Sequence, residues 1–118
     1  MSASSLPAIR TVASQLSQAL ERYQSDFDEM VESWMDRHCY QTVAAELHDI
    51  RMMKGALPQL SEEMADVLMG HVDMVHSVWN AQIRPSPDAT FEMKRLRQRH
   101  RAAVEAMGRK CAEISSQQ

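Results

Sequence analysis

The sequence predicts an all-α fold, and three observations support this class. The chain of 118 residues has only 3 glycines and 4 prolines, fewer than the frequent turns of an all-β chain require. Neither residue type occurs between Pro7 and Gly55. Apolar residues recur there every three or four positions, which is the period of one helix face. We therefore expect one domain over residues 1–118, a four-helix bundle of antiparallel helices with unequal lengths.

The first helix is expected over about residues 7–37. Pro7 suits its first turn, because the N–H that proline lacks has no partner within the helix at that position. At 100° per residue, one face of this helix is apolar and the opposite face is polar. The apolar face consists of Ile9, Val12, Ala13, Leu16, Leu20, Tyr23, Phe27, Met30, Val31 and Trp34.

A second helix is expected over about residues 40–56, because the phase of the apolar pattern changes. Its apolar residues are Tyr40, Val43, Leu47 and Ile50. On the wheel of the first helix these residues fall on the polar side, so one straight helix cannot bury both faces against one core. We therefore place a turn near Asp36–Cys39. Gly55 suits the end of the second helix, and Pro58 prevents its continuation.

The third helix is expected over about residues 62–83, with Ser61 as its N-cap. Glu62 and Glu63 favour this start, because carboxylates are stabilised at the positive end of the helix dipole. Apolar residues cover about half of its circumference, so the helix needs neighbours on more than one side. They are Met64, Val67, Leu68, Val72, Met74, Val75, Val78, Trp79 and Ile83.

The fourth helix is expected over about residues 88–114. Pro85 and Pro87 place a loop before it, since each proline disfavours helix in the preceding residue. The first and last helices are much longer than the second, so their apolar faces extend past it. A second copy of the chain would cover this surplus, and we expect a homodimer. The expected interface residues are Leu68, Val72, Val75, Trp79, Leu96, His100 and Met107.

The net charge of −3 conceals an uneven distribution. Residues 1–83 carry 5 basic and 12 acidic side chains, and residues 84–118 carry 8 basic and 4 acidic ones. The basic cluster on the last helix consists of Lys94, Arg95, Arg97, Arg99 and Arg101. Such a cluster is typical of a helix that contacts nucleic-acid phosphates. The favoured alternative is that these side chains are solvated or face the acidic side of the first helix.

Nothing in the sequence indicates a metal, a cofactor or an enzyme. His71 and His76 are five residues apart, which is not the i, i+4 spacing of two ligands on one helix face. A Glu-x-x-His motif, which di-iron helical bundles carry, is absent from the sequence. The chain also lacks a Gly-rich phosphate loop and a nucleophile elbow. We expect a protein without catalytic residues, cofactor or metal.

Two short stretches resemble phosphorelay proteins. Glu46-Leu47-His48-Asp49 resembles the phospho-acceptor tetrapeptide of a class of sensor histidine kinases. Arg51-Met52-Met53-Lys54-Gly55-Ala56 is similar to the acceptor stretch of histidine-phosphotransfer domains. Those domains carry their phosphorylated histidine where this chain has Arg51, and His48 lies one turn earlier. The resemblance implies a degenerate phosphotransfer bundle, with His48 as the acceptor in that alternative.

Methionine is the unusual component of the composition, with 10 of 118 residues. Several methionines surround the junction of the second and third helices, where flexible thioethers suit either an irregular core or an adaptable binding surface. The expected partner-binding residues are Arg51, Met52, Met53, Lys54, Met64 and Met69.

The sequence therefore predicts a non-enzymatic regulatory or adaptor protein that binds, and sequesters, a protein such as a bacterial-type transcription regulator. A secretion-type chaperone for a helical subunit is an alternative. The two cysteines lack the spacing of a disulfide framework, and no apolar run is long enough to span a membrane. We expect a cytoplasmic protein with no membrane contact.

Overall fold

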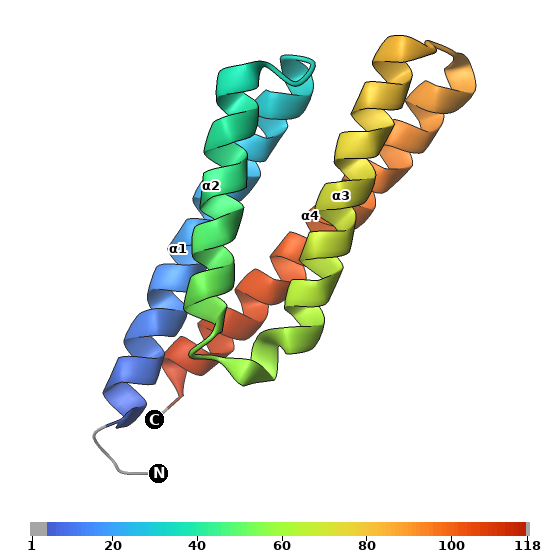
Figure 1. The fold of residues 1–118 in the computed structure, drawn as a ribbon. Helices are drawn as coiled ribbons and strands as arrows, with labels where there is room; N and C mark the ends of the chain where they lie inside the picture. Colours follow the sequence, from blue (N-terminus) through green and yellow to red (C-terminus); the bar gives the residue numbers. More distant parts are fainter. Residues whose placement is uncertain (1–4, 118) are drawn as a thin grey trace.

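The computed structural model describes residues 5–117, and within this range it contains helices and no strand (Figure 1). The predicted all-α class is thereby confirmed. The helices are α1 (Ser5–Glu32), α2 (Arg37–Lys54), the short 3-10 helix η1 (Pro58–Leu60), α3 (Ser61–Ile83) and α4 (Pro87–Ser116). None of these helices has the length and apolar character that crossing a membrane requires.

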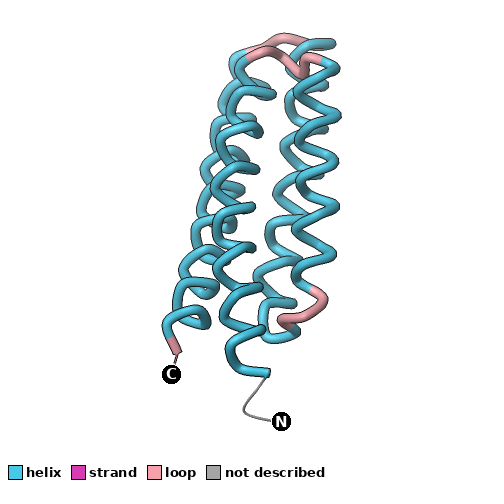
Figure 2. Tube along the Cα trace, turned by 90° about the vertical axis from the view of Figure 1, so that its left-hand side faces the viewer, coloured by secondary structure: helices cyan, strands magenta, loops and turns pink. Residues whose placement is uncertain are grey.

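Successive long helices run in opposite directions. The start of α1, the end of α4 and the connection from α2 to α3 lie at one end of the molecule, and the other two loops lie at the opposite end (Figures 1 and 2). α1 packs against both α2 and α4, and α3 packs mainly against α4, whereas α2 and α3 share few contacts. The molecule is elongated, with extents of 56 × 24 × 17 Å.

The first helix ends five residues earlier than the sequence predicts, at Glu32. The N–H of Met35 donates to the carbonyl of Met30 at 2.8 Å, and the N–H of Trp34 donates to that of Val31 at 3.1 Å. This pair of bonds is the Schellman motif, in which glycine usually supplies the left-handed residue. Here Trp34 has a φ of 55° and Met35 a φ of 66°. The prediction that Trp34 belongs to the buried face of the first helix is therefore wrong.

The separate second helix is confirmed, although it begins at residue 37 rather than about residue 40. Asp36 caps it, since the N–H of Cys39 donates to Asp36 Oδ2 at 3.2 Å. Ser61, expected as a cap, is instead the first residue of α3. Ser86 caps α4 by accepting a hydrogen bond from the N–H of Ala89 at 3.0 Å. The remaining predicted helix ends agree with the structure to within two residues.

The core runs along the inside of the helices and consists mainly of aliphatic, methionine and aromatic side chains. Burying one large apolar side chain contributes about 1.5–3 kcal/mol relative to leaving it in water. The predicted apolar face of α1 supplies much of this core. The largest fully buried apolar side chains are Leu16, Leu20, Tyr23, Phe27, Met30, Ile50, Leu57, Leu60, Met74 and Met107.

A polar cluster lies inside this core, where α1, α3 and α4 meet. Tyr23 Oη is 2.8 Å from His71 Nδ1 and 2.9 Å from His100 Nε2. Phe27 stacks on the His100 ring, with the ring centroids 4.1 Å apart. His100 is fully buried and His71 is 9% exposed. We refer to Tyr23, His71 and His100 as the core triad.

The core triad has one favoured arrangement of protons. His100 Nδ1 is buried and has no hydrogen-bond partner among the described residues. A buried N–H without an acceptor is rarer in proteins than an unused acceptor, so we assign the proton of His100 to Nε2. His100 Nε2–H then donates to Tyr23 Oη, and the Tyr23 hydroxyl donates to His71 Nδ1. Both imidazoles are neutral in this arrangement.

Gly70 allows α3 to approach α4 closely at the core triad. A Cβ atom at this position would lie 3.0 Å from His100 Cδ2 and 3.2 Å from His100 Cα. The second of these atoms belongs to the backbone of α4 and cannot move away as a flexible side chain would. The absence of a side chain at Gly70 therefore allows the close spacing of α3 and α4 at His100.

Candidate functional site

α3 has apolar residues on two faces, and the core covers only one of them. Val67, Met74 and Val78 are completely buried on the inner face. A second apolar row follows α3 beside this buried face, with successive spacings of four, three, four and four residues. These spacings keep the side chains on one face of a helix. The row consists of Leu68, Val72, Val75, Trp79 and Ile83, which we call the α3 face.

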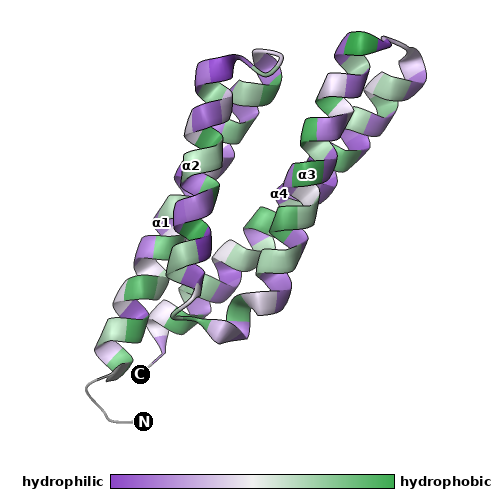
Figure 3. Ribbon diagram, viewed as in Figure 1, coloured by the Kyte–Doolittle hydropathy of each residue, from purple (hydrophilic) through white to green (hydrophobic). Residues whose placement is uncertain are grey.

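The α3 face is largely in contact with water. Val72 is 51% exposed, Trp79 47% and Ile83 73%, whereas Leu68 and Val75 are half-buried against the core. Hydrophobic segments recur along the length of α3 in Figure 3. Single exposed apolar residues are common on protein surfaces, but a continuous row of them marks a surface that another apolar surface covers. The α3 face is therefore our candidate site.

The loop between α1 and α2 adds a second exposed tryptophan to this end of the molecule. Gln82 Nε2 donates to the carbonyl oxygen of Trp34 at 2.7 Å, which holds the loop beside the last turn of α3. Trp79 and Ile83 flank Gln82 on that helix. Trp34 is 50% exposed. Trp34 was not predicted as a surface residue, since its apolar spacing continues the buried face of α1.

Trp34 stands where glycine would be more stable. We expect the free energy of unfolding of Trp34→Gly to be about 1 kcal/mol higher than that of Trp34→Ala. Alanine keeps the steric strain of a left-handed residue, whereas glycine does not. Both variants lack the indole ring, so the comparison isolates the backbone. Urea denaturation of the two variants measures the difference. Equal stabilities would contradict the strain that we assign to this loop.

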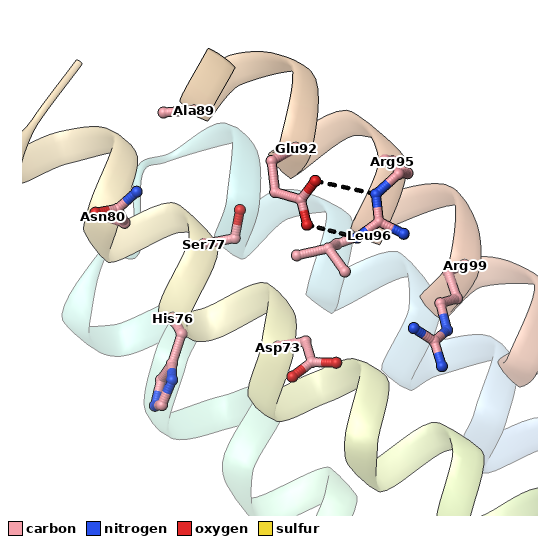
Figure 4. A pocket seen from close by; sticks show the side chains of 9 residues that line it. All are labelled: Asp73, His76, Ser77, Asn80, Ala89, Glu92, Arg95, Leu96 and Arg99. Carbon is pink, nitrogen blue, oxygen red and sulfur yellow. Dashed lines mark hydrogen bonds and ion pairs between the residues drawn. The ribbon is translucent and has the colours of Figure 1, made fainter. Parts of the chain in front are cut away.

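A polar groove of about 390 Å³ lies between α3 and α4. Its lining includes the acidic side chains of Asp73 and Glu92 and the basic side chains of Arg95 and Arg99 (Figure 4). Arg95 donates two hydrogen bonds to the Glu92 carboxylate, and this contact lowers the pKa of Glu92. On the α3 side, His76, Ser77 and Asn80 line the groove together with Asp73. The groove thus combines both signs of charge, with one pair already joined.

Part of the basic cluster on α4 faces acidic residues of α1. Arg97 lies 3.1 Å from Asp28 and 3.3 Å from Glu32, and Arg101 lies 3.0 Å from Asp28. This is the arrangement that the favoured interpretation of the sequence predicted for these two arginines. Arg95 is paired with Glu92 on its own helix. Lys94 and Arg99 are exposed. Intramolecular pairing of three of the five side chains reduces the charge that the cluster offers to phosphates.

The predicted partner-binding residues do not form one surface. Met64 is only 4% exposed and belongs to the core, so its assignment to a binding surface is wrong. Met52 is 68% exposed. It follows the buried Val43 by nine residues, which places it on the opposite side of α2. Met69 is 56% exposed and lines a groove between α3 and α4. The others lie near Met52 on α2: Arg51 is exposed, and Met53 and Lys54 are half-buried.

The structure divides the predicted interface residues between two locations. Leu68, Val72, Val75 and Trp79 all belong to the α3 face. On α4, Leu96 is half-buried against the core, whereas His100 and Met107 are completely buried within the single chain. Their prediction as contacts to a second copy is therefore wrong. The apolar row that the spacing on α4 predicts is covered by α1 and α3 of the same chain.

His48, the predicted phosphate acceptor of the phosphotransfer alternative, is exposed on α2.

Glu46 lies on the same helix as His48. It has a buried carboxylate oxygen without a hydrogen-bond partner among the described residues. Burial, followed by the proximity of Asp26, raises the pKa of Glu46 to about 7. The carboxyl group of Glu46 therefore titrates near neutral pH.

No family model, curated protein or solved structure matches this chain.

Proposed function

We propose that this chain is a non-catalytic regulatory or adaptor protein that binds another protein through the α3 face. The observation that carries this proposal is the exposed row of Val72, Trp79 and Ile83 on a helix whose inner face already forms the core. Covering apolar surface is favourable by roughly 25 cal/mol for each Å² removed from water. A partner that covers the row therefore gains affinity without any rearrangement of the core.

The chemistry of the surface selects the kind of partner. A straight apolar row on a helix accepts the apolar side of another helix, which places side chains every three or four residues against it. Exposed tryptophans are common among the residues that dominate binding energy, and Trp34 and Trp79 lie at the same end of α3. Strain retained at Trp34, where glycine would be more stable, supports a binding role for this side chain.

Sequestration is the simplest regulatory effect of such binding. A partner whose apolar helix is covered by this chain cannot use that helix in another complex. We propose a transcription regulator as the first class of partner, and a helical subunit held by a secretion chaperone as the alternative. We place the activity in the cytoplasm, where unpaired cysteines such as Cys39 and Cys111 remain reduced.

The test compares proteins captured from native lysate by the wild-type chain and by Trp79→Glu. We expect at least one protein other than this chain itself to be captured by the wild type and to be reduced about tenfold or more by Trp79→Glu. A carboxylate at this position remains without a partner once an apolar helix covers it. Quantitative mass spectrometry measures the change and identifies the captured protein.

Met52→Glu is the matched control, because Met52 is also an exposed apolar residue but lies on α2. This variant is expected to capture the same protein as the wild type. Loss of capture in both variants, or in neither, would exclude the α3 face as the binding surface. The identity of the captured protein separates a transcription regulator from a secreted subunit.

A further inference from the structure

The α3 face lies along a row of residues with the spacing of a coiled-coil seam. Alternate steps of three and four residues connect its positions over about 26 Å of helix, which is the repeat that brings two helices together along their length. The seam consists of Ala65, Leu68, Val72, Val75, Trp79 and Gln82. Four of these residues are exposed, and Leu68 and Val75 are half-buried against the core.

After Glu62, the column of residues beside the seam contains no aspartate, glutamate, lysine or arginine. Met69, His76 and Ile83 follow the seam on its open side, and all three are exposed. In most coiled coils this edge carries acidic and basic residues that select the partner by charge. Along the middle of α3, a partner helix must therefore match the seam through shape rather than through paired charges.

α3 itself meets this requirement when two copies run in opposite directions. The two-fold axis then passes beside the peptide bond between Asp73 and Met74. Each seam residue faces a residue of the other copy, and the two residue numbers add up to 147. Val72 then faces Val75, and Leu68 faces Trp79, so two valine layers lie at the centre with a larger layer on either side of them. Ala65 faces Gln82. A parallel pairing would instead place Trp79 against Trp79.

Charge at the ends of α3 also favours the antiparallel direction. Glu62 lies in the first turn of α3, and Arg84 directly follows its last residue. Antiparallel pairing brings Glu62 of one copy to the end where the other copy has Arg84. Parallel pairing brings Glu62 next to Glu62 and aligns the two helix dipoles. Opposite charges and opposed dipoles are the more favourable combination.

We propose that the α3 face binds a second copy of this chain, as an antiparallel two-fold pair of α3 helices. This inference rests on the proposed function only in using the same surface: a protein partner that offers its own apolar helix competes with the second copy. Four of the six residues that pair are exposed in the single chain, and the exposed part of Leu68 and Val75 completes the surface.

Charge substitutions at the central layer test both the pairing and its direction. The wild type is expected to sediment as a dimer at tens of micromolar. Val72→Glu and Val75→Lys are each expected to raise the dissociation constant about tenfold or more, because each places a charge against valine. The double variant Val72→Glu/Val75→Lys is expected to regain dimerisation, since antiparallel pairing sets glutamate against lysine in both central layers.

Several outcomes would overturn the proposal. A monomeric wild type, or single variants that dimerise like the wild type, would exclude pairing through α3. A double variant that associates no better than the single variants would exclude the antiparallel register. Circular dichroism of each variant verifies the helical fold, and Met52→Glu on α2 is expected to remain dimeric. The capture experiment with Trp79→Glu tests the proposed function and does not depend on dimerisation. A monomeric wild type that still captures another protein would therefore exclude the pairing of α3 helices but leave the proposed function intact.

Discussion

Replacing Tyr23 by phenylalanine is expected to lower the free energy of unfolding by about 2–4 kcal/mol. The substitution removes one oxygen atom, which is the hydrogen-bond partner of both His71 and His100. Two buried ring nitrogens then lose their partners, and an unpaired buried polar group costs about 1–3 kcal/mol. Shape and apolar area change little, so the loss reports on the hydrogen bonds of the core triad. Urea denaturation followed by circular dichroism measures the change.

Tyr40→Phe is the matched control, because it removes the same hydroxyl group from a side chain that is 40% exposed. Its stability is expected to stay within about 0.5 kcal/mol of the wild type, as is usual for surface substitutions. If Tyr23→Phe were as stable as Tyr40→Phe, the two hydrogen bonds of Tyr23 would contribute nothing to stability, and our proton assignment for the core triad would have to be revised.

Lowering the pH from 7 to 5 is expected to destabilise the variant Glu46→Gln by about 2 kcal/mol through His100 alone. Burial, together with the neighbouring His71, lowers the pKa of His100 from 6.5 to about 4. Asp28 opposes this shift, and Arg101 adds to it. Below pH 6.5 the unfolded chain binds a proton that the native His100 does not bind. Stability is therefore lost as the pH falls from about 6.5 towards 4.

His71 adds to this loss, because burial lowers its pKa as well. Glu46 acts in the opposite direction in the wild type. Its pKa is raised from 4.5 to about 7, so below pH 7 the native carboxyl group binds a proton before the unfolded one does. Protonation of Glu46 therefore stabilises the native state as the pH falls. The wild type is expected to depend less on pH over this range than Glu46→Gln does.

Urea denaturation at pH 7, 6 and 5 tests this difference in slope. Asp66→Asn, which removes a carboxylate from the exposed side of α3, serves as the control and is expected to follow the wild type. A Glu46→Gln variant whose stability is the same at pH 7 and pH 5 would show that His100 and His71 do not remain neutral in the folded protein.

Much of the fold follows from local patterns in the sequence. The change of apolar phase between Trp34 and Tyr40 separates two helices, although no glycine or proline marks the break. As predicted, α2 ends before Pro58, and α4 begins within one residue of its predicted start, at Pro87. These signals are readable because helix period and proline geometry act over a few neighbouring residues. The end of α1 was missed because a Schellman turn at Trp34 and Met35 lacks its usual glycine.

The candidate site was predicted only in part. The sequence shows that apolar residues cover half of α3, and four residues of the α3 face were expected to contact a second copy. The sequence does not show that His100 and Met107 are covered by their own chain. Met52 and Met69 are exposed, yet they lie on different helices and do not form one surface. Helical spacing defines which residues share a face, but it does not tell which neighbour covers that face.

The sequence by itself determined that this chain is helical, where most of its helices begin and end, and which residues of each helix are apolar. The tertiary structure decided where α1 stops, because the bond from Gln82 to the carbonyl of Trp34 helps to hold a turn that is locally unfavourable. It also decided that one apolar side of α3 is buried while the other meets water. Packing against α4 covers only one side of α3, and α2, which makes few contacts with α3, leaves the other side largely exposed.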